Sequence, residues 1–316
     1  GKYAFLESGI TSLSITSYHV GKYAFAYCEN LKSVELNSDM LDEHCFEGCK
    51  ALTKVTSTDK RFQPNIKNFA FANFSELANV SIEIIKSVGE YAFAWTPKLN
   101  CALFIAGDVH AHGFEGSGIK SVELHSSLID DYAFANCKNL TNVTSTATTY
   151  GKHSFEGSAI TKLTITNNAS TIGDYAFANC NALEEVQLKD ATVGSCAFLN
   201  CTALKSLELN NRKDGRIVSA NAFKGCNGLK RTDIYGTNYI SNYEPGAFEG
   251  CTGAVYIHDN THNYILGKSP LTGSSFTELF FIDKSEIVGQ NFINDMPRLT
   301  HAVFTSIKNL INPIAA

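Results

Sequence analysis

The side chains best suited to chemistry in this sequence belong to nine histidines and ten cysteines. Two histidine pairs, His110-x-His112 and His258-x-x-x-His262, have spacings that occur at metal sites. His112, however, falls in a column that Tyr, Phe or His fills elsewhere, two residues before a recurring Phe, so we interpret it as a packed ring. His258 has no third ligand nearby in the sequence. We therefore predict no metal site.

Most of the ten cysteines share one column of a repeated pattern, three residues after the recurring Phe. Serine takes this place in shorter copies of the pattern. Small buried groups that hydrogen-bond to backbone explain such a mixed Ser/Cys column. Parallel side chains in consecutive copies lack the torsion angle that a disulfide requires. The sequence therefore predicts free thiols and leaves the redox compartment open. The members of the column are Cys28, Cys49, Cys137, Cys180, Cys201, Cys226 and Cys251.

Other familiar signs of catalysis or of special partners are missing from the sequence. No G-x-S-x-G, Walker, H-E-x-x-H or C-x-x-C motif occurs, so we expect neither an enzyme nor a cofactor. The net charge is −5 with 18% charged residues and no basic stripe, which disfavours nucleic acid as a partner. No apolar run reaches the length of a membrane span. The chain starts in the middle of a repeat without a signal sequence, and we interpret it as a mature form or an excised fragment.

A repeat that runs through the chain would position these side chains. An apolar anchor, nearly always Phe, recurs in steps of 20 to 25 residues. Such a period predicts a solenoid of stacked coils, about 14 coils of about 22 residues, within a single domain over residues 1–316. The anchors are Phe5, Phe25, Phe46, Phe71, Phe93, Phe114, Phe134, Phe155, Phe177, Phe198, Phe223, Phe248, Leu271 and Ile293.

The columns around the anchor predict the local structure of each coil. A small residue precedes the anchor, and an apolar residue five positions before it forms a second inward wall. A Leu-x-x-Val-x-Leu pattern follows the anchor, and its period of two predicts a strand with one buried face. The Tyr-Ala-Phe segment holds good helix formers, so we expect a short helical or 3-10 turn there. In the coil after Phe93 the pattern changes, and we expect Ala102 and Phe104 to take the inward strand positions.

The pattern I-G-x-Y-A-F-x-x-C-x-x-L-x-x-V-x-L, complete at Ile172–Leu188, resembles the BspA-like, or treponemal-type, leucine-rich repeat. The resemblance covers essentially the whole chain. It implies an α/β leucine-rich-repeat solenoid, a right-handed horseshoe with a parallel β-sheet on its concave side. It also implies an extracellular or cell-surface location and an adhesin-like role. All of the matching columns are structural, so the resemblance alone identifies no ligand.

The strand positions that flank the inward residues predict where a ligand would bind. They are short and polar in most coils but become aromatic towards the C-terminal end. The candidate ligand-binding residues are Arg231, Tyr235, Tyr256, His258 and Phe280. Exposed aromatic rings beside a few polar side-chain groups are typical of protein interfaces. An equally good explanation is that these coils are irregular or pack against a neighbouring domain.

Two functions from different classes therefore remain open. The first is a non-enzymatic extracellular or cell-surface module that binds a host or matrix protein or glycan through its concave face. The second is a structural spacer with no ligand of its own. A binder should carry one clustered aromatic or charged patch, whereas a spacer should be evenly polar, as the first eight coils nearly are.

Overall fold

The computed structural model describes residues 1–165, 167, 170–210, 217–235, 243–258, 271–282, 287–288, 296–305 and 309–310. The chain divides into two compact units, Gly1–Ala159 and Ile160–Ala316. The single domain expected over residues 1–316 stays a prediction. The expected anchor Ile293 lies outside the described residues, as does His262 of the second histidine pair.

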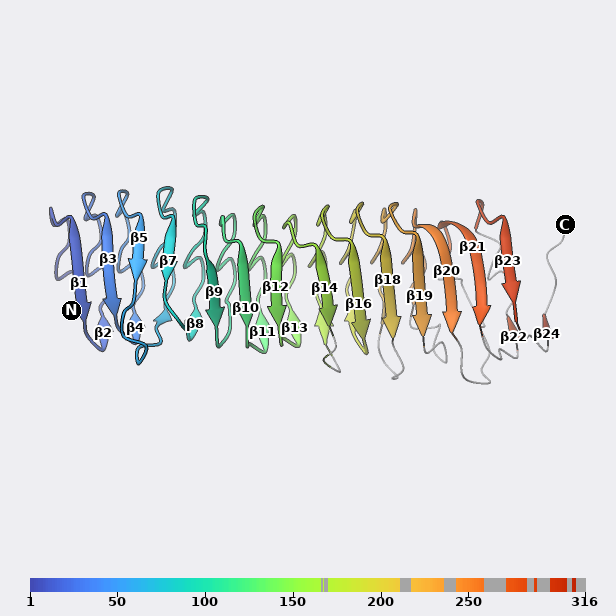
Figure 1. The fold of residues 1–316 in the computed structure, drawn as a ribbon, viewed down its shortest axis with the longest axis horizontal. Coiled ribbons are helices and arrows are strands. Elements are labelled where there is room, and N and C mark those ends of the chain that lie inside the picture. The colour runs from blue at the N-terminus through green and yellow to red at the C-terminus, as the bar shows by residue number, and fades with distance from the viewer. Residues whose placement is uncertain are drawn as a thin grey trace. The chain divides into compact units, whose positions relative to one another are not determined.

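The first unit is built from parallel strands, one long strand in each coil (Figure 1). The long strands form two sheets, in the orders β1-β3-β5-β7 and β9-β10-β12. Short strands form a second wall, in which β2, β4, β6 and β8 pair in this order and β11 pairs with β13. The long strands are β1 (Ser12–Thr16), β3 (Ser33–Asn37), β5 (Lys54–Thr56), β7 (Asn79–Ser81), β9 (Ala102–Ile105), β10 (Ser121–Leu124) and β12 (Asn142–Ser145). The short strands are β2 (His19–Val20), β4 (Met40–Leu41), β6 (Asn65–Ile66), β8 (Ser87–Val88), β11 (Leu128–Ile129) and β13 (Thr149–Tyr150).

The second unit repeats this arrangement with one seven-stranded parallel sheet. Two pairs of short strands are also present, β15 with β17 and β22 with β24. The sheet consists of β14 (Lys162–Ile165), β16 (Glu185–Lys189), β18 (Ser206–Asn210), β19 (Arg231–Tyr235), β20 (Thr252–His258), β21 (Ser275–Ile282) and β23 (His301–Phe304). The short strands are β15 (Thr171–Ile172), β17 (Thr192–Val193), β22 (Ile287–Val288) and β24 (Asn309–Leu310).

The anchors form the core of both units, as predicted. Their rings stack face to face with centroids 5.0–5.5 Å apart in the first unit. The corresponding distances from Phe177 to Phe248 are 4.9–5.6 Å. Each ring buries about 150–250 Å². The strands alternate as expected, with Val34 and Leu36 buried and Ser33 and Glu35 more exposed.

The strand β9 corrects one part of the sequence-based register. Leu103 and Ile105 are the buried residues of this strand, whereas Ala102 is exposed and Phe104 is half-buried. The predicted inward positions were therefore wrong by one residue, and a one-residue shift turns every side chain to the opposite face. The consequence is that Phe104 lies on the outer face of the long-strand sheet.

The Tyr-Ala-Phe segments differ from the predicted helical or 3-10 turns, because the described residues contain no helix of either kind. Two residues in each segment, such as Tyr23 at φ 54° and Tyr27 at φ 59°, adopt the left-handed conformation, which interrupts a helix. Alternate N–H groups instead donate to the next coil, as Phe25 does to the Cys45 carbonyl at 2.8 Å. Hydrogen bonds between coils therefore replace those that a helix would make within one coil.

The fold is a leucine-rich-repeat-type parallel β-solenoid. About 11 coils have a long strand, a second inward residue and a buried Phe anchor within the described residues. The full count of about 14 coils and the right-handed horseshoe with a concave sheet stay predictions.

The ten cysteines are all free thiols, as predicted. In most of the column the Sγ–H group donates to the carbonyl of an anchor in an earlier coil, for example from Cys49 to Phe25 at 3.1 Å and from Cys137 to Phe114 at 3.1 Å. Burial raises the pKa of the Cys49 thiol to about 12, so the reactive thiolate is scarce at neutral pH. The Cys49 thiol therefore serves packing and hydrogen bonding.

Candidate binding surface

The five candidate residues lie on three neighbouring strands, β19, β20 and β21, and face the same side of the sheet. The parallel register aligns Asp233 with Tyr256 and Tyr256 with Phe280. It also aligns Tyr235 with His258. We call the surface made by Arg231, Asp233, Tyr235, Tyr256, His258 and Phe280 the aromatic face.

Asp233 lies at the centre of the aromatic face and is only 8% exposed. Arg231 donates two hydrogen bonds to its carboxylate, from Nε to Oδ2 at 2.6 Å and from Nη2 to Oδ1 at 2.8 Å. Nε2 of His258 lies 2.9 Å from the same Oδ1. Bidentate pairing of this kind fixes the guanidinium plane as well as its position.

The rings of the aromatic face form two stacks, which Asp233 joins through its bonds to Arg231 and His258. The Arg231 guanidinium lies 4.1 Å from the centroid of the Tyr256 ring, a cation–π contact. Tyr256 stacks on Phe280 with centroids 4.6 Å apart, and Phe280 meets the edge of His301 at 6.0 Å. Tyr235 stacks on His258 at 4.1 Å. The predicted residues therefore form one connected cluster.

Two members of this cluster lie outside the five candidate ligand-binding residues. Asp233 joins Arg231 to His258, and His301 extends one of the two stacks. The Arg-x-Asp spacing is a signal for the first, because residues two apart on a strand share a face. The position of His301 depends on the pairing between β21 and β23. This pairing places His301 beside Glu278, on the strand next to that of Phe280.

The histidine pairs do not form a metal centre in the part of the chain that the structure describes. Within those residues no group of three or more His, Cys, Asp or Glu side chains could hold a metal ion. His112 is sandwiched between the rings of Tyr91 at 4.4 Å and Tyr132 at 4.8 Å, as the packing interpretation predicted. Nε2 of His258 is directed at Asp233.

Burial alone would raise the pKa of Asp233, but the hydrogen bonds from Arg231 and His258 outweigh it and hold this pKa below its ordinary value of 3.8. Asp233 also raises the pKa of Arg231. Because the folded pKa of Asp233 is depressed, its contribution to stability is complete above the unfolded pKa. That contribution is lost as the pH falls through the lower folded pKa.

Substituting Arg231 should reverse this shift. In an Arg231→Ala variant the burial of Asp233 remains while its strongest partner is gone, so we expect the Asp233 pKa to move upward. A titration of the carboxyl carbon by ¹³C NMR measures it in the parent and in the variant. An Asp233 pKa that is equal in both proteins would contradict the pairing described here.

The parallel solenoid, in which each long-strand sheet buries one face, defines the class of the leucine-rich-repeat solenoids. The sequence model of the BspA type leucine rich repeat region matches six copies over residues 1–110, 107–230 and 190–300. Because these matches span nearly the whole chain, the protein belongs to the BspA-type leucine-rich-repeat family. The search among curated proteins gives no match.

Solved structures similar to this chain include three bacterial proteins. A leucine-rich repeat protein from Bacteroides ovatus is 18% identical with a TM-score of 0.47, over 95% of this chain and 82% of that one. The pneumococcal vaccine antigen PcpA is 17% identical with a TM-score of 0.42, over 97% and 72%. A leucine rich cell surface protein from Faecalibacterium prausnitzii is 17% identical with a TM-score of 0.36, over 97% and 81%.

Across the described residues, no helix has the length and apolar character needed to cross a membrane.

Proposed function

We propose that this protein is a non-enzymatic, adhesin-like binding module that acts outside the cell or on its surface. Its partner is a protein or glycan of a host or of a matrix, and the aromatic face is the surface that recognises it. Membership in the BspA-type family supports the extracellular location. The clustered side chains of the aromatic face support recognition.

The observation that carries this proposal is that the aromatic face is held in place while still reaching solvent. The side chain of Arg231 is 52% exposed although it makes two hydrogen bonds and a cation–π contact. Tyr235, Tyr256 and Phe280 are each half-buried and stacked. Binding costs about 0.5–1.5 kcal/mol for each rotamer-rich side chain that it immobilises. A surface that is already ordered avoids much of that cost.

The composition of the aromatic face supports the same conclusion. Tyr and Arg are among the residue types enriched at interface hot spots. The strand face of the first unit is different, since Ser12, Ser14 and Ser33 provide short hydroxyl side chains there. A structural spacer would have this evenly polar character in both units. The spacer is therefore the function that remains if the experiment below finds no protection of the aromatic face.

Hydroxyl-radical footprinting tests this proposal at the level of single rings. The chain is oxidised free and after adsorption to an extracellular-matrix preparation, and oxidation is read by mass spectrometry. We expect Tyr235, Tyr256 and Phe280 to become protected in the bound chain. Tyr18, which is 74% exposed in the other unit, is the internal control and should oxidise equally in both. Unchanged oxidation of the three rings in the bound chain would contradict the proposal.

A further inference from the structure

The long-strand sheet of the first unit is interrupted between β7 and β9. β7 pairs with β5, and β9 pairs with β10, but β7 and β9 belong to different sheets. Hydrogen bonds close the interruption at both ends. Asn100 N–H donates to the Ala78 carbonyl at 3.0 Å on one side, and Ile85 N–H donates to the Phe104 carbonyl at 2.9 Å on the other.

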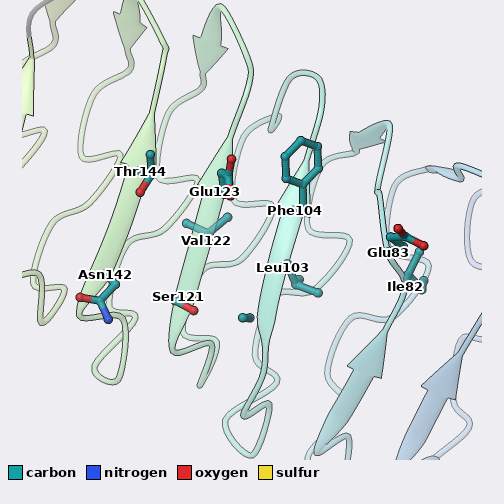
Figure 2. A pocket seen from close by; sticks show the side chains of 10 residues that line it. Ile82, Glu83, Leu103, Phe104, Ser121, Val122, Glu123, Asn142 and Thr144 are labelled. Carbon is teal, nitrogen blue, oxygen red and sulfur yellow. The ribbon is translucent and has the colours of Figure 1, made fainter.

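A hollow of about 450 Å³ lies at this interruption. Its volume falls within the range of about 300–1,000 Å³ that is usual for small-ligand sites. Figure 2 shows its side chains, which come from the segment after β7 and from β9, β10 and β12. The register aligns Phe104, Glu123 and Thr144 in one row across the strands. The residues that matter most here are Glu83, Phe104, Ser121, Glu123, Asn142 and Thr144.

Phe104 supplies the apolar surface of the hollow. Its ring stacks on His125 with centroids 4.9 Å apart. His125 is the residue directly after the end of β10. Ile82 and Glu83, in the segment that follows β7, also line the hollow (Figure 2). His125 therefore packs against the ring of Phe104, and this half-buried ring still lines the hollow. The face of an aromatic ring is electron-rich and attracts the positive edges of C–H bonds.

The polar groups around this ring offer hydrogen bonds, and each of the two carboxylates among them already has one partner. Oε1 of Glu123 lies 2.8 Å from Nε2 of His125, and Lys60 Nζ lies 3.1 Å from the Glu83 carboxylate. An ionised carboxylate has about four acceptor positions, so both groups can still accept further bonds. The side chains of Ser121, Thr144 and Asn142 add donors and acceptors.

We propose that this hollow is a binding site for a neutral saccharide. A sugar ring presents a face of C–H groups and a rim of hydroxyls, which matches a half-buried aromatic ring surrounded by hydrogen-bond acceptors and donors. Lys60 pairs with Glu83, and His125 occupies one acceptor position of Glu123, so both carboxylates have partners within the protein and keep acceptor positions for sugar hydroxyls. The small side chains of Ala102 and Ser121 leave room for the sugar between Phe104 and Asn142. This site is separate from the aromatic face, and it does not depend on the function proposed above.

The experiment is saturation-transfer NMR on the whole chain with short neutral oligosaccharides of glucose, galactose, mannose and N-acetylglucosamine at millimolar concentration. Two variants address the hollow. Phe104→Ala removes the stacking surface, and Ala102→Trp fills the space from an exposed position. Ser12→Trp is the matched control, because Ser12 is likewise the exposed first residue of a long strand. Circular dichroism and thermal melting verify that all variants fold.

We expect at least one of these neutral oligosaccharides to bind the parent and the Ser12→Trp control equally. Both hollow variants should bind it at least about tenfold more weakly, or about 1.4 kcal/mol. The site is refuted if none of the sugars binds, or if folded Ala102→Trp and Phe104→Ala bind like the parent. It is also refuted if only a cationic probe such as spermine binds and Glu123→Gln abolishes that binding.

Discussion

Replacing Phe114 with alanine is expected to lower the free energy of unfolding by about 3–5 kcal/mol. Phe114 is fully buried, and its ring stacks on Phe93 at 5.0 Å and on Phe134 at 5.1 Å. The backbone of the coils on both sides is hydrogen-bonded to this coil. Phe93 N–H donates to the Gly113 carbonyl, and Phe114 N–H donates to the Ala133 carbonyl. The surrounding structure therefore cannot collapse into the cavity that the substitution leaves.

Phe5→Ala is the matched control, with the same change at an equivalent position. Phe5 is 50% exposed and stacks on Phe25 at 5.0 Å, so far less buried surface is lost. Urea unfolding followed by circular dichroism measures both variants, and we expect the Phe5 variant to lose much less stability than the Phe114 variant. In a stack where each coil contacts only its neighbours, the position along the stack must matter. Equal losses at the two sites would contradict that organisation.

The buried residues could be predicted from the sequence because every coil repeats the same environment. A Phe anchor and a Val-x-Leu pair recur at fixed spacing, so each copy confirms the assignment of the others. Phe114, Val122 and Leu124 are accordingly all buried. This redundancy fails where a coil is irregular. Ala102 and Phe104 were placed inward because the pattern around them is weak, and the structure buries Leu103 and Ile105 instead.

The conformation of the Tyr-Ala-Phe segments could not be predicted from local preferences. Tyr and Ala favour helix or strand conformations, yet Tyr23 and Tyr27 have positive φ angles. Their N–H groups donate to carbonyls of the next coil, Tyr23 to Glu43 and Tyr27 to Glu47. These bonds exist only once two coils are stacked. Tertiary contacts therefore override the local propensity.

The outward position of the candidate residues was predictable, but the contacts among them were not. Alternation along a strand places Arg231 and Tyr235 on the outer face, and both are found there. The stacking of Tyr256 on Phe280 and the bond from His258 to Asp233 depend on how neighbouring strands align. A bulge between Gly253 and Ala254 shifts that alignment, and no sequence pattern indicated it.

Removing the three rings of the aromatic face should abolish most of its binding. In a Tyr235→Ala, Tyr256→Ala and Phe280→Ala variant, Arg231 loses the ring beneath it and His258 loses its stacking partner. Loss of one interface hot spot costs about 2 kcal/mol or more, roughly thirtyfold in affinity. These positions alternate with the buried residues, so the core keeps its volume. The buried neighbours are Ile234, Ile257, Leu279 and Phe281.

The matched control carries three alanine substitutions on the strand face of the first unit, Ser12→Ala, Ser33→Ala and Asn79→Ala. These positions lie on β1, β3 and β7 and do not line the hollow beside Phe104. Both variants should melt close to the parent, because neither set of side chains is fully buried. A difference in binding between them would therefore report on the surface that was changed.

The most direct measurement is the apparent dissociation constant of the parent, the triple-ring variant and the control on one extracellular-matrix preparation. Recognition through the aromatic face predicts that the triple-ring variant binds at least about thirtyfold more weakly, while the control matches the parent. If the folded triple-ring variant binds as tightly as the parent, the aromatic face is not the binding surface. The structural spacer would then be the better explanation of this chain.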